Sequence, residues 1–272
     1  MNKRLVAATV GLCALVAGAR SAPCALIYVS DYQGNVAKYE TTMGSLTAVG
    51  NLNGFTIGKV MGLAYDGSTN SLLLLDRNGR MAYSMNAQTG TAAQLFSLSR
   101  PFQGGAVRGG LLYGIDEALG TMSAYSLSDH SLYSLSGNVA PAHTHAIGVD
   151  ALSGQLYSMA NGSIRTISDD GVFGAPVLTT QASFLNDLDY YDGDFVGVIQ
   201  GRGIDIIDGG SGQLTSLVTR GQLEGLGLDM SIAGQGVAVV VPEPSTYALW
   251  IILIMTIWSL RKRFNLHKKP RA

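Results

Sequence analysis

A recurring pattern of short apolar segments constrains the fold of this chain more than any other feature. Each segment has residues typical of β-strands and is bounded by turn residues. The clearest ones are residues 27–29, 73–75, 112–114, 156–158, 195–197 and 238–240. Their centres lie 39 to 46 residues apart. A period of about 40–45 residues with several strands per repeat is typical of the blades of a β-propeller.

The second repeat shows four strand-like segments in succession. From innermost to outermost they are residues 62–66, 71–76, 80–86 and 92–98. The residues between them have turn chemistry, as in Gly67-Ser68-Thr69-Asn70. The innermost pattern, an apolar segment that ends on aspartate, recurs at residues 146–150, 185–189 and 225–229. The pattern therefore predicts an all-β domain built from four-stranded blades.

The two ends of this domain predict how the ring closes. Residues 26–31 match a second strand, and residues 225–229 match an innermost strand that has no complete blade of its own. Joined, they form one composite blade, which with four continuous repeats gives a β-propeller of five blades. Residues 236–241 then either lead out of the domain or begin a sixth blade. A two-sheet sandwich or a β-helix is the alternative fold.

The charge of the predicted domain limits its partners. Residues 22–241 contain nine Lys and Arg against 18 Asp and Glu, a formal charge of −9, although the whole chain carries only −1. A domain this acidic, with no basic stripe, repels phosphate backbones, so nucleic-acid binding is disfavoured. Cys24 is its only cysteine, so the fold depends on an apolar core and not on an internal disulfide.

Two clusters have residue types that can bind metals. In His143-Thr144-His145, strand spacing would point both imidazoles the same way, but a third ligand is missing and His130 is the only other histidine of the domain. The second cluster, residues 187–194, holds four aspartates, the oxygen ligands that calcium prefers. Its spacing departs from a calcium loop, and a hairpin turn explains Asp192-Gly193. We predict no metal and no cofactor.

Linear catalytic motifs are absent from the sequence. There is no Gly-x-Ser-x-Gly elbow, no phosphate-binding loop and no His-Glu-x-x-His motif. The alternative is a propeller hydrolase or lactonase-like enzyme, with a divalent cation held by the strand-end aspartates. These are Asp66, Asp150, Asp189 and Asp229. Such aspartates more often cap turns by accepting hydrogen bonds from their own backbone, and we predict no catalytic residue.

The first 21 residues have the order of a secretory signal peptide. Lys3 and Arg4 precede an apolar run at residues 5–19, and the two candidate cleavage triplets are Ala17-Gly18-Ala19 and Ala19-Arg20-Ser21. A retained N-terminal anchor is the alternative.

The C-terminal segment, residues 242–272, has three parts that point to a membrane. Pro242-Glu243-Pro244 comes first, an uncharged apolar run follows at residues 247–260, and Arg261-Lys262-Arg263 comes directly after the run. The run predicts a transmembrane helix at 245–260, and the basic triplet is expected to stay cytoplasmic. The apolar run has 14 residues, fewer than the roughly 20 that a bilayer core requires. So short a helix suits a segment that is recognised and then removed.

At residues 241–264 the sequence resembles the PEP-CTERM sorting signal. The matching motif consists of Val241, Pro242, Glu243, Pro244 and Ser245, and the cytoplasmic stop signal of Arg261, Lys262 and Arg263. The resemblance implies processing by an integral-membrane exosortase in a Gram-negative bacterium that makes extracellular polysaccharide. A permanent C-terminal anchor is the alternative.

These features together predict an exported cell-surface or extracellular-matrix protein with a non-catalytic binding or structural role. The expected partners are the Sec export machinery, an exosortase-type enzyme, the inner membrane through the C-terminal helix, and extracellular polysaccharide or surface proteins. The precursor would be anchored in the inner membrane with a periplasmic body. The mature form would lie at the cell surface or outside the cell.

Overall fold

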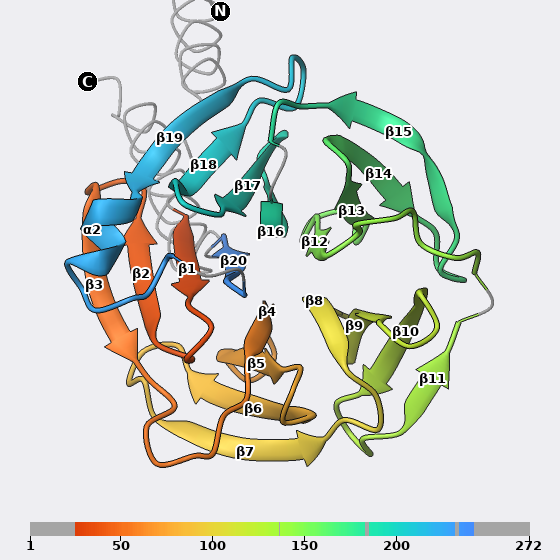
Figure 1. Ribbon diagram of the computed structural model, residues 1–272, viewed down its shortest axis with the longest axis horizontal. Coiled ribbons are helices and arrows are strands. Elements are labelled where there is room, and N and C mark those ends of the chain that lie inside the picture. The colour runs from red at the N-terminus through yellow and green to blue at the C-terminus, as the bar shows by residue number, and fades with distance from the viewer. Residues whose placement is uncertain (1–24, 136, 183–184, 232–233, 242–272) are drawn as a thin grey trace, which may run out of the picture. The chain divides into compact units, whose positions relative to one another are not determined.

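The computed structural model describes residues 25–135, 137–182, 185–231 and 234–241. Residues 25–240 form one compact unit. Its strands pair into five four-stranded antiparallel sheets, which stand as blades around a common axis (Figure 1). The prediction of an all-β, five-bladed β-propeller is therefore confirmed.

Each blade runs from an innermost strand at the axis to an outermost strand at the rim. Blade 1 contains β20 (Gly236–Val240), β1 (Leu26–Ser30), β2 (Val36–Glu40) and β3 (Ser45–Gly50). Blade 2 contains β4 (Val60–Asp66), β5 (Ser71–Asp76), β6 (Met81–Asn86) and β7 (Ala92–Ser97). Blade 3 contains β8 (Phe102–Arg108), β9 (Leu111–Asp116), β10 (Thr121–Ser126) and β11 (Leu132–Ser134).

The other two blades follow the same order. Blade 4 contains β12 (Ala146–Val149), β13 (Leu156–Ala160), β14 (Ser163–Ile167) and β15 (Phe173–Thr179). Blade 5 contains β16 (Leu185–Tyr191), β17 (Asp194–Ile199), β18 (Gly203–Ile207) and β19 (Leu214–Thr219). A short helix, α2 (Arg220–Glu224), follows β19.

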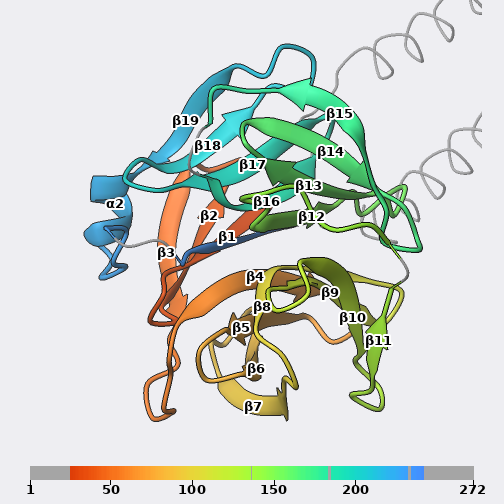
Figure 2. The same cartoon turned by 45° about the vertical axis from the view of Figure 1, so that its right-hand side comes forward.

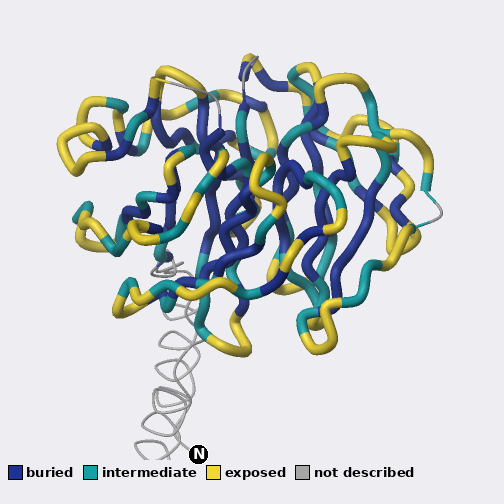
Figure 3. Tube along the Cα trace, turned by 60° about the horizontal axis from the view of Figure 1, so that its bottom comes forward, coloured by how far each residue is buried: buried dark blue, intermediate teal, exposed yellow. Residues whose placement is uncertain are grey.

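The hydrophobic core lies between the blades. One fully buried cluster joins Leu63, Leu72 and Leu74 of blade 2 to Tyr28 and Val36 of blade 1. Further clusters occupy the junctions of blades 2 and 3, 3 and 4, and 4 and 5. The two inner strands of each blade are buried along most of their length, whereas exposed residues gather in the outermost strands and in the loops (Figure 3). Burial on both faces makes these inner strands nearly continuous apolar runs.

The ring closes with a different strand from the one predicted. Residues 225–229 were expected to be the innermost strand of the composite blade, but they form the turn after helix α2 and the start of a loop. Strand β20 takes that place and pairs with β1 over its whole length, from Leu26 opposite Val240 to Ser30 opposite Gly236. Figure 2 shows β20 beside β1 and inside the ring.

Local chemistry explains the exchange of these segments. Two glycines within three residues, Gly225 and Gly227, weaken any strand at 225–229, whereas Val237 and Val239 are β-branched. A capping box between Thr219 and Gln222 also begins helix α2 just before that segment. Residues 236–240 are therefore neither surplus nor the start of a sixth blade.

Most of the predicted export and sorting residues lie outside the described part of the chain. This holds for residues 1–21, for the predicted helix 245–260, and for Pro242, Glu243, Pro244, Ser245, Arg261, Lys262 and Arg263. Val241 is described and follows directly on β20. No helix among the described residues has the length and apolar character needed to cross a membrane.

Candidate functional site

The axis of the ring is closed by close approach of the innermost strands. Four of these strands carry a glycine at the point of approach: Gly236, Gly62, Gly104 and Gly148. A Cβ added to Gly148 would lie 2.7 Å from the Cα of Asp189, and one added to Gly62 would lie 2.7 Å from the carbonyl carbon of Gly104. Side chains at these positions would push the blades apart, so glycine allows the backbones to meet.

Two aspartates of β16 complete the closure. Asp187 accepts hydrogen bonds from the backbone N–H of Leu63 on β4 (3.3 Å) and of Val237 on β20 (3.1 Å). Asp189 accepts from Val149 on β12 (3.0 Å) and from Val239 on β20 (2.7 Å). The two carboxylates therefore link β16 to three other innermost strands, whose N–H groups point toward the axis and away from the blade ladders.

Burial controls the protonation of this pair. Asp187 is 0% exposed and Asp189 is 8% exposed. Burial raises the pKa of Asp189 to about 7, against the opposing effect of the N–H groups of Val239 and Val149. Burial also raises the pKa of Asp187, and the nearby carboxylate of Asp189 raises it further. Both groups thus hold strands together in a site with little access to solvent.

The other strand-end aspartates do not join Asp189. Asp66 accepts hydrogen bonds from the N–H of Ser68 (3.0 Å) and the hydroxyl of Thr69 (2.7 Å). Asp150 accepts from the N–H of Leu152 (2.9 Å), and Asp229 accepts from the N–H and hydroxyl of Ser231. These three side chains cap the turns in which they lie.

The structure shows the positions of the two clusters that have metal-binding residue types. Asp192-Gly193 is the hairpin turn between β16 and β17, and Asp194 accepts a hydrogen bond from the N–H of Gly209 (2.9 Å). His143 lies in a turn with a φ of +61°, so the predicted strand spacing of the histidine pair is wrong. No group of three His, Cys, Asp or Glu within the described ranges is arranged to hold a metal ion.

The histidines themselves have other contacts. The rings of His143 and His145 are 6.4 Å apart, and the Nδ1 atom of His145 lies 2.5 Å from the side-chain oxygen of Gln103. His130 stacks on Phe96, with 4.5 Å between ring centroids, at the rim of blades 2 and 3.

Three buried aspartates outside the predicted sites form hydrogen bonds on one face of the ring. Asp31, Asp76 and Asp116 follow or end the second strands of blades 1, 2 and 3 and are 0% exposed. Asp76 accepts hydrogen bonds from the N–H groups of Gly58 (2.8 Å) and Lys59 (2.7 Å), which lie in the loop that leads into β4, the innermost strand of the same blade. We call this the top face, the face at which the innermost strands begin. The sequence signal is an apolar strand ending on Asp, with Gly three or four residues later.

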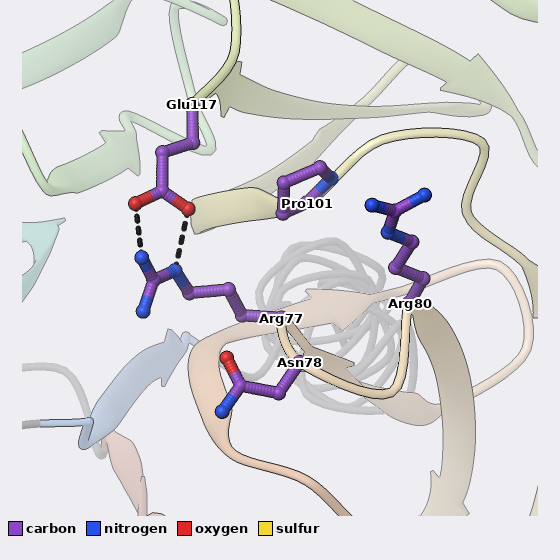
Figure 4. Close-up of a pocket in the computed structure, with 5 residues that line it drawn as sticks. All are labelled: Arg77, Asn78, Arg80, Pro101 and Glu117. Carbon is purple, nitrogen blue, oxygen red and sulfur yellow. Dashed lines mark hydrogen bonds and ion pairs between the residues drawn. The ribbon is translucent and has the colours of Figure 1, made fainter.

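A pocket of about 240 Å³ opens on the top face between blades 2 and 3. Arg77, Asn78, Arg80, Pro101 and Glu117 line it (Figure 4). The guanidinium of Arg77 forms two hydrogen bonds with the carboxylate of Glu117. This pairing raises the pKa of Arg77 and lowers that of Glu117, so both side chains are charged at neutral pH.

Basic side chains concentrate around this pocket. Lys59, Arg77, Arg80 and Arg100 are four of the nine Lys and Arg in residues 22–241. Arg100 is bound to the buried Asp116 (2.7 Å), and the pKa of Lys59 is lowered by burial and by the charge of Arg77. The guanidinium of Arg80 has no hydrogen-bond or ion-pair partner among the described residues. The pocket therefore offers one free guanidinium on an otherwise acidic domain.

Comparison with known proteins supports the fold. No protein-family model matches the chain, and no curated protein matches it. A crystal structure of a nidogen/laminin complex contains a chain that is 10% identical, with a TM-score of 0.58 over 79% of this chain and 98% of the other. A structural genomics protein of unknown function from Bacteroides thetaiotaomicron is 17% identical, with a TM-score of 0.51 over 66% of this chain and 55% of the other. At these identities the likeness establishes the fold alone, and the described domain is a five-bladed β-propeller.

Proposed function

We propose that this chain is an exported surface or matrix protein, whose propeller binds partners without catalysing a reaction and whose C-terminal segment is a sorting signal. The observation that carries the proposal is the order of that segment: Pro242-Glu243-Pro244, then an apolar run at 247–260, then Arg261-Lys262-Arg263. A signal-peptide-like N-terminus agrees with it, because both ends then direct the domain between them out of the cytoplasm.

The geometry of the axis supports a binding role over a catalytic one. The innermost strands meet backbone to backbone, and Asp187 and Asp189 are occupied by backbone N–H groups. The hydrolase alternative needs strand-end aspartates that act together on a cation. Asp66, Asp150 and Asp229 instead cap separate turns, so the loops of the two faces are the better candidates for contact with partners.

The proposed route begins with Sec-dependent export. The domain would then lie in the periplasm, held on the inner membrane by the helix 245–260, with Arg261-Lys262-Arg263 in the cytoplasm. Proline at 242 and 244 would fix φ on both sides of Glu243 and would keep this stretch extended, where a membrane-embedded protease could reach it. An exosortase-type enzyme would cut near the motif and release or transfer the domain.

Replacement of Pro242-Glu243-Pro244 by three alanines tests the proposal. The helix is expected to extend through the alanines, so a full-length precursor should accumulate in the inner membrane. Cell fractionation with mass spectrometry of the C-terminal peptides measures this. Three alanines at residues 265–267, beyond the basic cluster, provide the matched control and should leave processing unchanged. If surface-located wild-type protein keeps peptides from residues 250–267, the segment is a permanent anchor and the sorting proposal is wrong.

A further inference from the structure

Arg80 is held in place at its backbone while its guanidinium is left without a described partner. The residue closes the turn between β5 and β6 with a φ of +50°. Its carbonyl oxygen accepts a hydrogen bond from the N–H of Leu98 (2.8 Å), which ties it to the end of β7. A planar guanidinium on a fixed base is suited to bind a carboxylate through two parallel hydrogen bonds.

The opposite wall of the pocket provides hydrogen-bond acceptors. The carboxylate of Glu117 is held by Arg77, and hydrogen bonding to Gln103 and the charge of His145 also lower its pKa. It is therefore ionised at neutral pH and can accept additional hydrogen bonds from hydroxyl groups. The exposed amide of Asn78 adds both a donor and an acceptor beside it.

An apolar surface separates these two polar walls. Pro101 lies between the Arg77–Glu117 pair and the guanidinium of Arg80 (Figure 4). Its ring has no N–H group and adds an apolar surface to the lining of the pocket. The pocket thus combines a cation, an apolar platform and an anionic acceptor.

We propose that this pocket binds one carboxylated sugar unit of an acidic polysaccharide. The carboxylate pairs with Arg80, the apolar face of the sugar ring lies on Pro101, and hydroxyl groups donate to Glu117 and Asn78. A volume of about 240 Å³ is below the roughly 300–1,000 Å³ typical of sites that enclose a whole small molecule, so one unit of a longer polymer fits this open site. The inference rests on the proposed function, because an exported protein is one that meets such polymers.

The charge of the domain selects the kind of polyanion. A duplex nucleic acid carries about one charge per 1.7 Å and would be repelled by a domain with a formal charge of −9. A polysaccharide in which acidic and neutral sugars alternate has a lower charge density. One of its carboxylates can pair with Arg80, while its neutral units pass over the surrounding acidic surface.

Titration calorimetry on the full chain in a mild nonionic detergent tests the proposal. The probe is a tetrasaccharide in which glucuronic acid alternates with a neutral sugar, and its partner is the same tetrasaccharide with the carboxylates reduced to alcohols. We expect the acidic form to bind at least about tenfold more tightly, since hydrogen bonds to charged groups contribute more than neutral ones. Binding should also weaken as salt is added.

Two variants separate a specific site from general attraction. Arg80→Gln should weaken binding of the acidic tetrasaccharide about tenfold. Lys38→Gln on β2 removes the same charge from blade 1, which contributes no residue to the lining of the pocket, and should leave affinity within about twofold. Equal losses in the two variants, or equal binding of the reduced tetrasaccharide, would overturn the proposal.

Further outcomes test the saccharide assignment separately from the proposed surface location. If tetraglutamate binds as tightly as the acidic tetrasaccharide, the pocket is a simple anion site and the saccharide assignment is wrong. Lack of any binding at millimolar concentrations also overturns the inference, while the proposed surface location is judged separately by fractionation and mass spectrometry. Failure of export would overturn the proposed function and leave the measured affinity intact.

Discussion

At the centre of the ring, the carboxylate of Asp189 accepts hydrogen bonds from the amides of Val149, Tyr190 and Val239, which lie on three different strands. Backbone N–H groups in a closed axis have no water to bind, and an unpaired one costs about 1–3 kcal/mol. The two oxygens of the carboxyl group accept all three hydrogen bonds between them, whereas an asparagine amide offers only one accepting oxygen. One residue therefore satisfies the inward-facing donors of two neighbouring blades.

The protonation of Asp189 should make stability depend on pH. Its folded-state pKa is about 7, above the ordinary value of 3.8, so the folded state holds the proton more tightly than the unfolded chain. The free energy of unfolding is then highest below about pH 4 for this group and falls as pH rises toward 7, by up to a few kcal/mol. The raised pKa of Asp187 acts in the same direction.

Asp189→Asn tests this assignment. The amide places an NH₂ group against one of the N–H donors, so stability should fall by about 1–3 kcal/mol at low pH, and the decline between pH 4 and 7 should become shallower. Urea unfolding at several pH values measures both effects. Asp208→Asn is the control, because that carboxyl caps an exposed turn and hydrogen bonds lower its pKa. An unchanged pH profile in the Asp189 variant would contradict the assignment.

Among the elements, the strands of continuous blades could be predicted from sequence and the closing strand could not. Blade 2 was predictable because each of its strands is a separate apolar run between turn residues, ending at Asp66, Asp76, Asn86 and Ser97. Residues 225–229 and 236–240 are both short apolar segments near the end of the domain. Local chemistry favours the second segment, because Gly225 and Gly227 weaken a strand in the first, but only pairing with β1, about 200 residues away, decides which segment closes the ring.

The candidate sites show the same division between local and long-range effects. Asp150 and Asp189 both follow an apolar segment, so the sequence predicts the same strand-end position for the two. In the structure Asp150 caps its own turn. Asp189 instead lies within β16, which continues two residues further to Tyr191, and is buried against β12 and β20. The pocket at Arg80 combines residues from two blades and therefore has no linear motif.

The contact between innermost strands can be tested at Gly148. A methyl group there would meet the backbone of Leu188 and Asp189 at 2.7 Å, so Gly148→Ala should cost about 1–3 kcal/mol of unfolding free energy. Gly221→Ala is the matched control, since that position lies in helix α2 with no heavy atom within 4 Å of an added Cβ. It should be neutral or stabilising by up to about 1 kcal/mol. Chemical denaturation of both variants decides between them, and equal losses would argue against close approach at the axis.

For the whole molecule, the ring is completed by its last strand. Without β20, strand β1 has an unpaired edge, and Asp187 and Asp189 lose Val237 and Val239 as donors. A chain that ends at Gln235 should therefore fail to unfold cooperatively and should associate through its open edge. A chain that ends at Val240 is the control and should melt as a single monomeric unit. Calorimetry and size-exclusion chromatography distinguish these results, and a cooperative monomer ending at Gln235 would show that closure is dispensable.

The pairing of β1 with β20 also determines which blade can be completed last. Ser30 and Gly236, which meet in the composite blade, are separated by 206 residues. At ribosomal rates of about 5–20 residues per second, the first strand waits about 10–40 s before its inner neighbour has been made. In the proposed export the chain emerges from the membrane in the same order, so blades 2 to 5, each from contiguous chain, can assemble there while blade 1 stays incomplete. A chaperone that protects the incomplete protein must therefore bind the N-terminal hairpin of β1 and β2 until β20 emerges.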